Sequence, residues 1–123
     1  MDFKEDKPIY LQIADRIMDE IIRSVYPEEK RIPSVREYAS VMEVNANTVA
    51  RSFDYLQQIA VIYTKRGLGY FVCANATERI MALRRKAFVE GDLPDMFRTI
   101  RLLQIPIEEI ADRYRDYCRN LSI

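Results

Sequence analysis

The sequence predicts a mainly α-helical chain in which three N-terminal helices precede one β-hairpin and further helices follow it. Two observations support this fold class. Apolar residues recur at helical spacing over most of the chain, which is the pattern of amphipathic helices. Between residues 61 and 72, two β-favouring runs flank a turn that contains two glycines, which is the pattern of a hairpin.

The charges of the chain cancel, with 19 lysines and arginines against 19 aspartates and glutamates. No broad positive field therefore attracts nucleic acid, although a dimer needs only a local basic strip. No apolar run approaches the roughly 18 residues of a membrane span, and the first residues do not have the pattern of a signal sequence. We therefore expect a cytoplasmic protein that does not bind membranes.

Candidate catalytic groups are few. The absence of histidine excludes a Ser-His-Asp triad, a Cys-His pair and most zinc sites. Cys73 and Cys118 are isolated in the sequence, and we interpret them as small core residues rather than as a disulfide framework or a metal pair. Because no nucleophile, base and metal can be combined into a site, the sequence predicts no enzyme, no metal and no cofactor.

The first predicted helix begins near Pro8, a residue suited to a first helical turn. Its apolar stripe consists of Ile9, Ile13, Ile17 and Ile21. The segment 25–33 contains two prolines, which bias the residues before them away from the helical conformation. This segment is therefore predicted to be a connecting loop.

A second and a third helix follow the loop. Ser34 and Glu37 have the spacing of a capping box, which predicts a helix over residues 34–42. Asn45 suits the N-cap of the next helix, which should extend to residue 56. The inner side of this third helix consists of Val49, Phe53 and Leu56. Asn47 and Arg51 stand on its outer side, where their planar groups can reach base edges and phosphates. The two helices form a helix-turn-helix pattern.

The hairpin adds a wing to this pattern. Residues 61–64 and 70–72 are its predicted strands, and Gly67 and Gly69 permit the positive φ angles of its turn. Lys65 and Arg66 place two positive charges at its tip, where they can contact a phosphate backbone or enter a minor groove. The sequence therefore predicts a winged helix-turn-helix domain over residues 1–74.

Residues 75–123 are predicted to form a short all-α segment. Helices are expected over residues 77–90, around residues 95–103 and from Pro106 onward, with a stop at 91–94 where Asp92 caps the next helix. The segment is too small to hold its own core, so we expect a homodimer. The expected dimerisation residues are Ile80, Leu83, Met96, Ile100, Ile110, Tyr114 and Tyr117. An alternative gives these helices a small effector pocket, although no motif identifies a ligand.

Four blocks carry a resemblance to a known family: PIYLQI, IPSVREYA, VNANTV and KRGLGYFV, in that order between residues 8 and 72. They are spaced as in the DNA-binding domain of GntR-family bacterial transcription regulators. The short helical tail and the start of the third helix resemble the YtrA subfamily. The resemblance implies a winged helix-turn-helix that binds double-stranded DNA.

The resemblance also implies roles for particular residues. Arg36 would contact phosphate or base, and the major groove would receive Asn45, Asn47 and Thr48. Arg66 and Gly67 would approach the minor groove. Two departures stand out: many members have arginines at the positions of Ala46 and Ala50, so Arg51 is expected to substitute, and their glycines near Val25, Glu29 and Ala60 are absent here.

Several of these side chains also have a purely structural interpretation. Arg36 could pair with a neighbouring acid on a solvated helix, where such pairs contribute only about 0–1 kcal/mol. Asn45 serves equally well as a cap and as a DNA contact, and Lys65 and Arg66 could be ordinary turn residues. We expect a homodimeric repressor that binds an inverted-repeat operator; the rival interpretation is a winged helix that binds another protein and shows no specific DNA binding.

Overall fold

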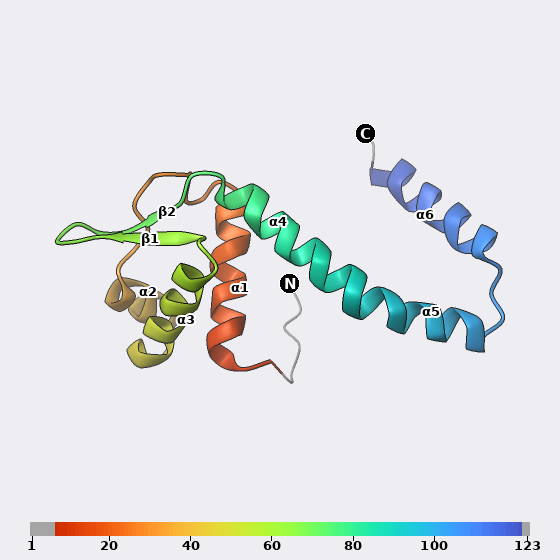
Figure 1. The fold of residues 1–123 in the computed structure, drawn as a ribbon, viewed down its shortest axis with the longest axis horizontal. Coiled ribbons are helices and arrows are strands. Elements are labelled where there is room, and N and C mark those ends of the chain that lie inside the picture. The colour runs from red at the N-terminus through yellow and green to blue at the C-terminus, as the bar shows by residue number, and fades with distance from the viewer. Residues whose placement is uncertain (1–6, 122–123) are drawn as a thin grey trace. The chain divides into compact units, whose positions relative to one another are not determined.

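The computed structural model describes residues 7–121 of the chain, and it divides into two compact units (Figure 1). The first unit ends at Leu83 and the second begins at Arg84. This division lies inside helix α4 (Ala76–Ala87) rather than at residue 74. The reason is that Ala76 and Ile80, in the first turns of α4, are fully buried in the core of the first unit.

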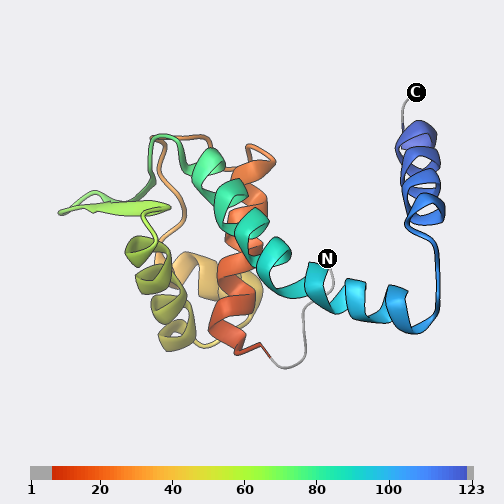
Figure 2. The same cartoon turned by 45° about the vertical axis from the view of Figure 1, so that its right-hand side comes forward.

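The first unit begins with the three helices expected from the sequence: α1 (Ile9–Ile22), α2 (Val35–Met42) and α3 (Ala46–Gln58). Helix α3 packs against both α1 and α2, and Figure 2 shows the three helices from a second direction. The isoleucine stripe of α1 faces inward, with Ile13, Ile17 and Ile21 buried and Ile9 exposed. The helix-turn-helix prediction is confirmed.

Side-chain caps fix where α2 and α3 begin. The hydroxyl of Ser34 accepts a hydrogen bond from the Glu37 backbone N–H, and the Glu37 carboxylate accepts one from the Ser34 N–H, both at 3.1 Å. This is the predicted capping box. Asn45 is the N-cap of α3, and its side-chain oxygen accepts from the Asn47 N–H at 2.7 Å. Both caps satisfy backbone donors that the first turn of a helix leaves free.

The hairpin consists of β1 (Ile62–Lys65) and β2 (Gly69–Val72), which pair antiparallel with Ile62 opposite Val72. The predicted connecting loop also pairs with this hairpin. The Ile32 N–H donates to the Tyr70 carbonyl, and the Val72 N–H donates to the Lys30 carbonyl, both at 3.0 Å. The loop thus lies along β2 and holds the wing against the helices.

The core lies between the three helices and the inner side of the hairpin. Phe53 on α3 is fully buried at its centre, with the Tyr70 ring edge-on at 4.9 Å and the Tyr38 ring at 6.4 Å between centroids. Burial of such aromatic and branched side chains is the main source of stability for the unit. The other fully buried large side chains are Ile17, Ile21, Val49, Leu56, Val61, Ile62, Val72 and Ile80.

At or beside the three positions where the resemblance implies glycines, the backbone is left-handed without glycine. Glu29 has φ +66° and Ala60 has φ +59°. Next to Val25, Ser24 has φ +63°. The Cβ atoms of these residues make the backbone strained there, because L-residues disfavour this region.

In the second unit the predicted stop at 91–94 is wrong. Helix α4 continues through a π-helical turn, Phe88–Asp92, into α5 (Leu93–Leu102). Asp92 makes no capping bond and has helical φ and ψ, so the expected cap is wrong as well. In a regular helix a proline ring clashes with the carbonyl four residues earlier. A π-helical turn changes the hydrogen-bond pattern before the proline, so the helix can continue. Here that turn ends at Asp92, two residues before Pro94.

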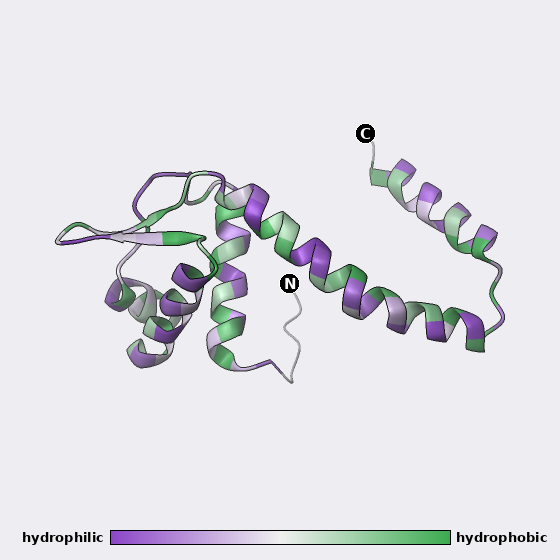
Figure 3. Ribbon diagram, viewed as in Figure 1, coloured by the Kyte–Doolittle hydropathy of each residue, from purple (hydrophilic) through white to green (hydrophobic). Residues whose placement is uncertain are grey.

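The last helix, α6 (Ile107–Leu121), and α5 have no buried residue. Both carry apolar and polar residues along their length, as the hydropathy colouring in Figure 3 shows. Over residues 7–121, no helix is both long and apolar enough to cross a membrane. The same residues contain no cluster of acidic or thiol side chains suited to a metal ion.

Candidate nucleic-acid interface

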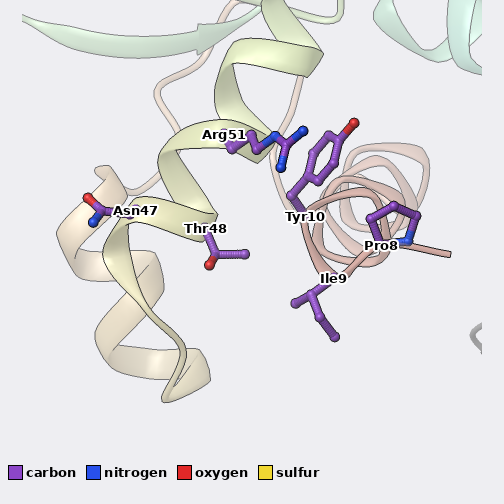
Figure 4. Close-up of a pocket in the computed structure, with 6 residues that line it drawn as sticks. All are labelled: Pro8, Ile9, Tyr10, Asn47, Thr48 and Arg51. Carbon is purple, nitrogen blue, oxygen red and sulfur yellow. The ribbon is translucent and has the colours of Figure 1, made fainter.

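The first two turns of α3 carry three of the predicted DNA-binding residues. Asn47 and Arg51 are exposed, and Thr48 is half-buried. Arg51 lies three positions after Thr48 and four after Asn47, so it is a neighbour of both on the helix surface. Together with Pro8, Ile9 and Tyr10 at the start of α1, they line an open hollow of about 380 Å³ (Figure 4). The structure thus brings these residues together beside α1.

Arg51 does not extend freely into solvent. Its guanidinium lies over the ring of Tyr10, 4.0 Å from the ring centroid, as Figure 4 shows. This contact between Tyr10 and Arg51 was not predicted, because the two residues are distant in sequence. The spacing of residues within one helix cannot reveal a contact between two helices.

The backbone of α1 is tied to α3 at the same place. The hydroxyl of Ser52 is fully buried and donates to the Tyr10 carbonyl at 2.7 Å, and it lies 3.1 Å from the Thr48 carbonyl. Because a buried hydroxyl without a partner is costly, this bond favours one fixed position of the α1 start relative to α3. The polar face of α3 is therefore built on a rigid base.

Asn45 and Arg36 occupy the helix starts. The cap at Asn45 uses only its side-chain oxygen, so its NH₂ group has no part in the cap. Arg36 is exposed on the first turn of α2, and within residues 7–121 it forms no ion pair. Its neighbour Glu37 pairs instead with Arg31, at 3.9 Å. The structural interpretation of Arg36 as the partner of a neighbouring acid is therefore not what the described residues show.

The capping box also affects the acid beside Arg36. The hydrogen bonds from Ser34, first from its backbone and then from its hydroxyl, lower the pKa of Glu37, and nearby Arg31 lowers it further. The lowered pKa favours the ionised form of Glu37, whose carboxylate accepts the hydrogen bond from the Ser34 N–H at the start of its own helix. The arrangement leaves the Arg36 guanidinium available for an anion.

The wing tip carries the remaining predicted residues. Arg66 is exposed, and Gly67 has φ +79° with open space around it. Lys65 lies against the aromatic side of the hairpin, with its ammonium 4.6 Å from the Phe71 centroid. The Phe71 ring in turn stacks on Tyr63 at 5.8 Å. The lysine is thus held at the edge of the tip by a cation–π contact.

Arg31 is a further exposed cation, and it lies beside the hairpin. The backbone of Arg31 forms an isolated antiparallel β-bridge with Phe71, and its side chain lies beside Gly69 of β2. A Cβ at Gly69 would lie 3.1 Å from its Nε, so only glycine fits there without displacing the guanidinium. Sequence reasoning missed Arg31 because it treated segment 25–33 as a connector. Its position two residues before Pro33 gave no signal of strand pairing.

The predicted dimerisation residues divide into three groups. Ile80 is fully buried in the first unit, so its side chain is already covered within one copy. Ile100 and Ile110 are half-buried. The others are exposed: Leu83, Met96, Tyr114 and Tyr117. On α6, the two tyrosines remain 66% and 64% exposed, which is unusual for such large apolar rings in a folded chain.

A helix-turn-helix with a two-stranded wing, polar residues on the exposed face of its third helix and cations at its wing tip defines the winged helix-turn-helix class. Residues 9–72 match the model of the bacterial regulatory proteins of the gntR family. The chain belongs to this family.

Relatives agree with this assignment. The chain is 39% identical over 74 residues to the uncharacterized HTH-type transcriptional regulator YhcF of Bacillus subtilis, a match that spans 60% of this chain and 61% of YhcF. It is 32% identical over 76 residues to the HTH-type transcriptional repressor YtrA of the same organism, spanning 62% of this chain and 58% of YtrA. The chain thus spans about three fifths of these relatives.

A solved structure extends the similarity beyond the winged helix. A GntR-family chain from Bacteroides thetaiotaomicron is 48% identical, with a TM-score of 0.84, and the match covers 94% of this chain and all of that one. The similarity therefore includes the C-terminal helices. The fold class predicted from the sequence, a winged helix-turn-helix followed by a short helical segment, is confirmed, and so is the resemblance to YtrA-type members of the family.

Proposed function

We propose that the chain is a DNA-binding transcriptional regulator that acts as a homodimer on an inverted-repeat operator and represses transcription by covering a promoter. The observation that supports this most is the concentration of planar polar groups on the exposed face of α3. Carboxamide and guanidinium groups on a recognition helix are suited to base edges and phosphates in a major groove. This binding uses only side chains of the protein and requires no cofactor.

The wing supplies the second contact. Arg66 and Gly67 at its tip approach the minor groove in this proposal, and Lys65 contacts the phosphate backbone beside it. A glycine without near neighbours lets the backbone of the tip come close to DNA. Since the whole chain has zero net charge, the attraction comes from this local strip and from Arg31, Arg36 and Arg51.

The exposed apolar side chains of α5 and α6 support the homodimer. They include Phe97, Leu102, Tyr114 and Tyr117, each at least half exposed. A twofold axis would cover the same side chains on both copies at once. It would also present two α3 helices to two half-sites one DNA turn apart, which accounts for an inverted repeat.

To test this proposal, duplexes that bind the full chain are selected from a random DNA pool. The affinity for the most enriched duplex is then measured at increasing salt concentration by fluorescence anisotropy. We expect an inverted repeat and a steep fall in affinity with salt, because bound cations release counterions from phosphate. Arg66→Ala should lower the steepness of the log–log salt dependence by about one. Arg119→Ala, which removes a cation from α6, is the matched control and should leave it unchanged.

The rival function is a winged helix that binds another protein, which the zero net charge favours. It predicts that no sequence is enriched from the pool and that the weak residual binding is the same for Arg66→Ala and Arg119→Ala. Either result would contradict the proposed regulator. An enriched sequence without twofold symmetry would contradict only the homodimeric part.

A further inference from the structure

We propose that Tyr10 is a positioning residue for DNA binding: its ring holds the Arg51 guanidinium so that the outer edge of this group binds a backbone phosphate. The inference rests on the proposed function and extends it to α1, which no predicted site residue occupies. It assigns the hollow between α1 and α3 to a phosphodiester.

The Tyr10 ring is itself held in place. The backbone carbonyl of Tyr10 accepts a hydrogen bond from the buried Ser52 hydroxyl at 2.7 Å. The Tyr55 ring packs edge-on against the Tyr10 ring, with 6.5 Å between the ring centroids. The face of the ring is left for the Arg51 guanidinium, 4.0 Å from the centroid. Two residues of α3 thus fix the ring on which the arginine lies.

In this stack the guanidinium of Arg51 can still bind an anion. A guanidinium that lies on a ring keeps its N–H donors in its own plane, where they can bind two phosphate oxygens side by side. Among residues 7–121 no carboxylate forms an ion pair with Arg51. The ring also restricts the rotamers of a long side chain, which reduces the entropy that DNA binding would otherwise remove.

The surroundings favour phosphate over a base edge. In Figure 4 the Asn47 side chain points away from the stack, whereas Arg51 and Thr48 face the hollow that Pro8 and Ile9 close on the other side. The hollow therefore offers a cation beside the start of α1. Asn47 is left to read base edges, and Arg51 fixes the register of the helix on the backbone.

A double-mutant cycle tests the coupling. We compare the wild type, Tyr10→Leu, Arg51→Ala and the double variant by anisotropy on the selected operator, with urea unfolding of each as a stability check. Tyr10→Leu should weaken binding about three- to tenfold when Arg51 is present, and less than about twofold when it is absent. Tyr10→Phe, which keeps the ring, should bind like the wild type.

Two further readouts separate positioning from structure. Arg51→Ala should lower the salt slope by about one and weaken all DNA sequences alike, as loss of a phosphate contact does. Arg51→Lys keeps the charge without the plane and should also bind at least about threefold more weakly, which tests the stack even if Tyr10→Leu does not fold.

The inference is overturned if Tyr10→Leu weakens binding equally in both backgrounds, if Tyr10→Phe loses as much as Tyr10→Leu, or if Arg51→Lys binds like the wild type. In each of these cases the wild type still binds its operator, and the proposed function stands. If the wild type enriches no operator and shows no salt dependence, the proposed function fails and this inference fails with it.

Discussion

The two units of the chain use the same kind of amphipathic helix to different ends. In the first unit the apolar sides of α1 and α3 meet and bury Ile17, Val49, Phe53 and Leu56 almost completely. In the second unit α5 and α6 have no fully buried residue, and Leu102 and Leu121 remain 80% and 65% exposed. An apolar stripe becomes a core only when the same chain supplies its partner. In the proposed homodimer, another copy of the chain covers the apolar sides of these helices.

The largest effect should come from the centre of the first unit. Phe53→Ala should destabilise it by about 3–5 kcal/mol, because the lost ring leaves a cavity between α3, Tyr38 and Tyr70. Urea unfolding followed by circular dichroism measures the change. Phe97→Ala on α5, where the ring is 52% exposed, is the control and should not move the transition of the first unit in this way. An equal loss of unfolding free energy in both variants would contradict the conclusion that only the first unit has a buried core.

The next effect should appear in the second unit. Tyr117→Asp places a charge on the apolar side of α6 and should reduce the molar mass to that of one chain, 14.5 kDa, because an unpaired buried charge is costly. Light scattering after size-exclusion chromatography gives the mass. Arg119→Asp, about 200° around the helix from Tyr117, is the control and should remain dimeric. A dimer that survives Tyr117→Asp would exclude this side of α6 from the interface.

A smaller effect should come from the start of α2. Ser34→Ala removes the hydroxyl of the capping box and should cost about 1 kcal/mol of unfolding free energy, measured in urea. Ser40→Ala, on the exposed end of the same helix, is the control and should change little. A cost no larger than that of the control would mean that the cap does not hold this helix.

The same cap should depend on pH. The pKa of Glu37 is lowered in the folded chain from its usual value near 4.5, so the ionised carboxylate stabilises the fold. This contribution is fully present above pH 4.5 and is lost as the pH falls through the lowered pKa. Glu37→Gln should therefore unfold with a weaker dependence on pH below 4.5 than the wild type. An identical pH dependence would contradict a role for the ionised cap.

The smallest effect should be a gain. Ala60→Gly relieves the strain of a left-handed residue but increases the freedom of the unfolded chain, and the balance should stabilise the first unit by roughly 0.5–1 kcal/mol. Thermal unfolding should show a rise of a few degrees. Ala50→Gly, inside α3, should instead lower stability by about 1 kcal/mol. A loss for Ala60→Gly would show that the turn is not strained.

The sequence predicted features that depend on near neighbours. The caps at Ser34 and Asn45 follow from residue types at fixed spacing, and the hairpin follows from two glycines between β-favouring runs. The continuation of the helix from α4 through Pro94 into α5 was not predicted, because a π-helical turn has no simple local sequence pattern. The Tyr10–Arg51 stack and the pairing of Arg31 with the wing were missed for a different reason: both join segments that only the folded core brings together.

The most direct test of the account compares an intact inverted repeat with a single half-site, for the wild type and for Tyr117→Asp. We expect two wild-type chains per intact repeat and much weaker binding to the half-site, because in the proposed homodimer the second unit joins two copies of the first. Tyr117→Asp should bind both duplexes about equally, as a single chain. One wild-type chain per duplex, or equal wild-type affinity for the repeat and the half-site, would contradict the division of roles between the two units.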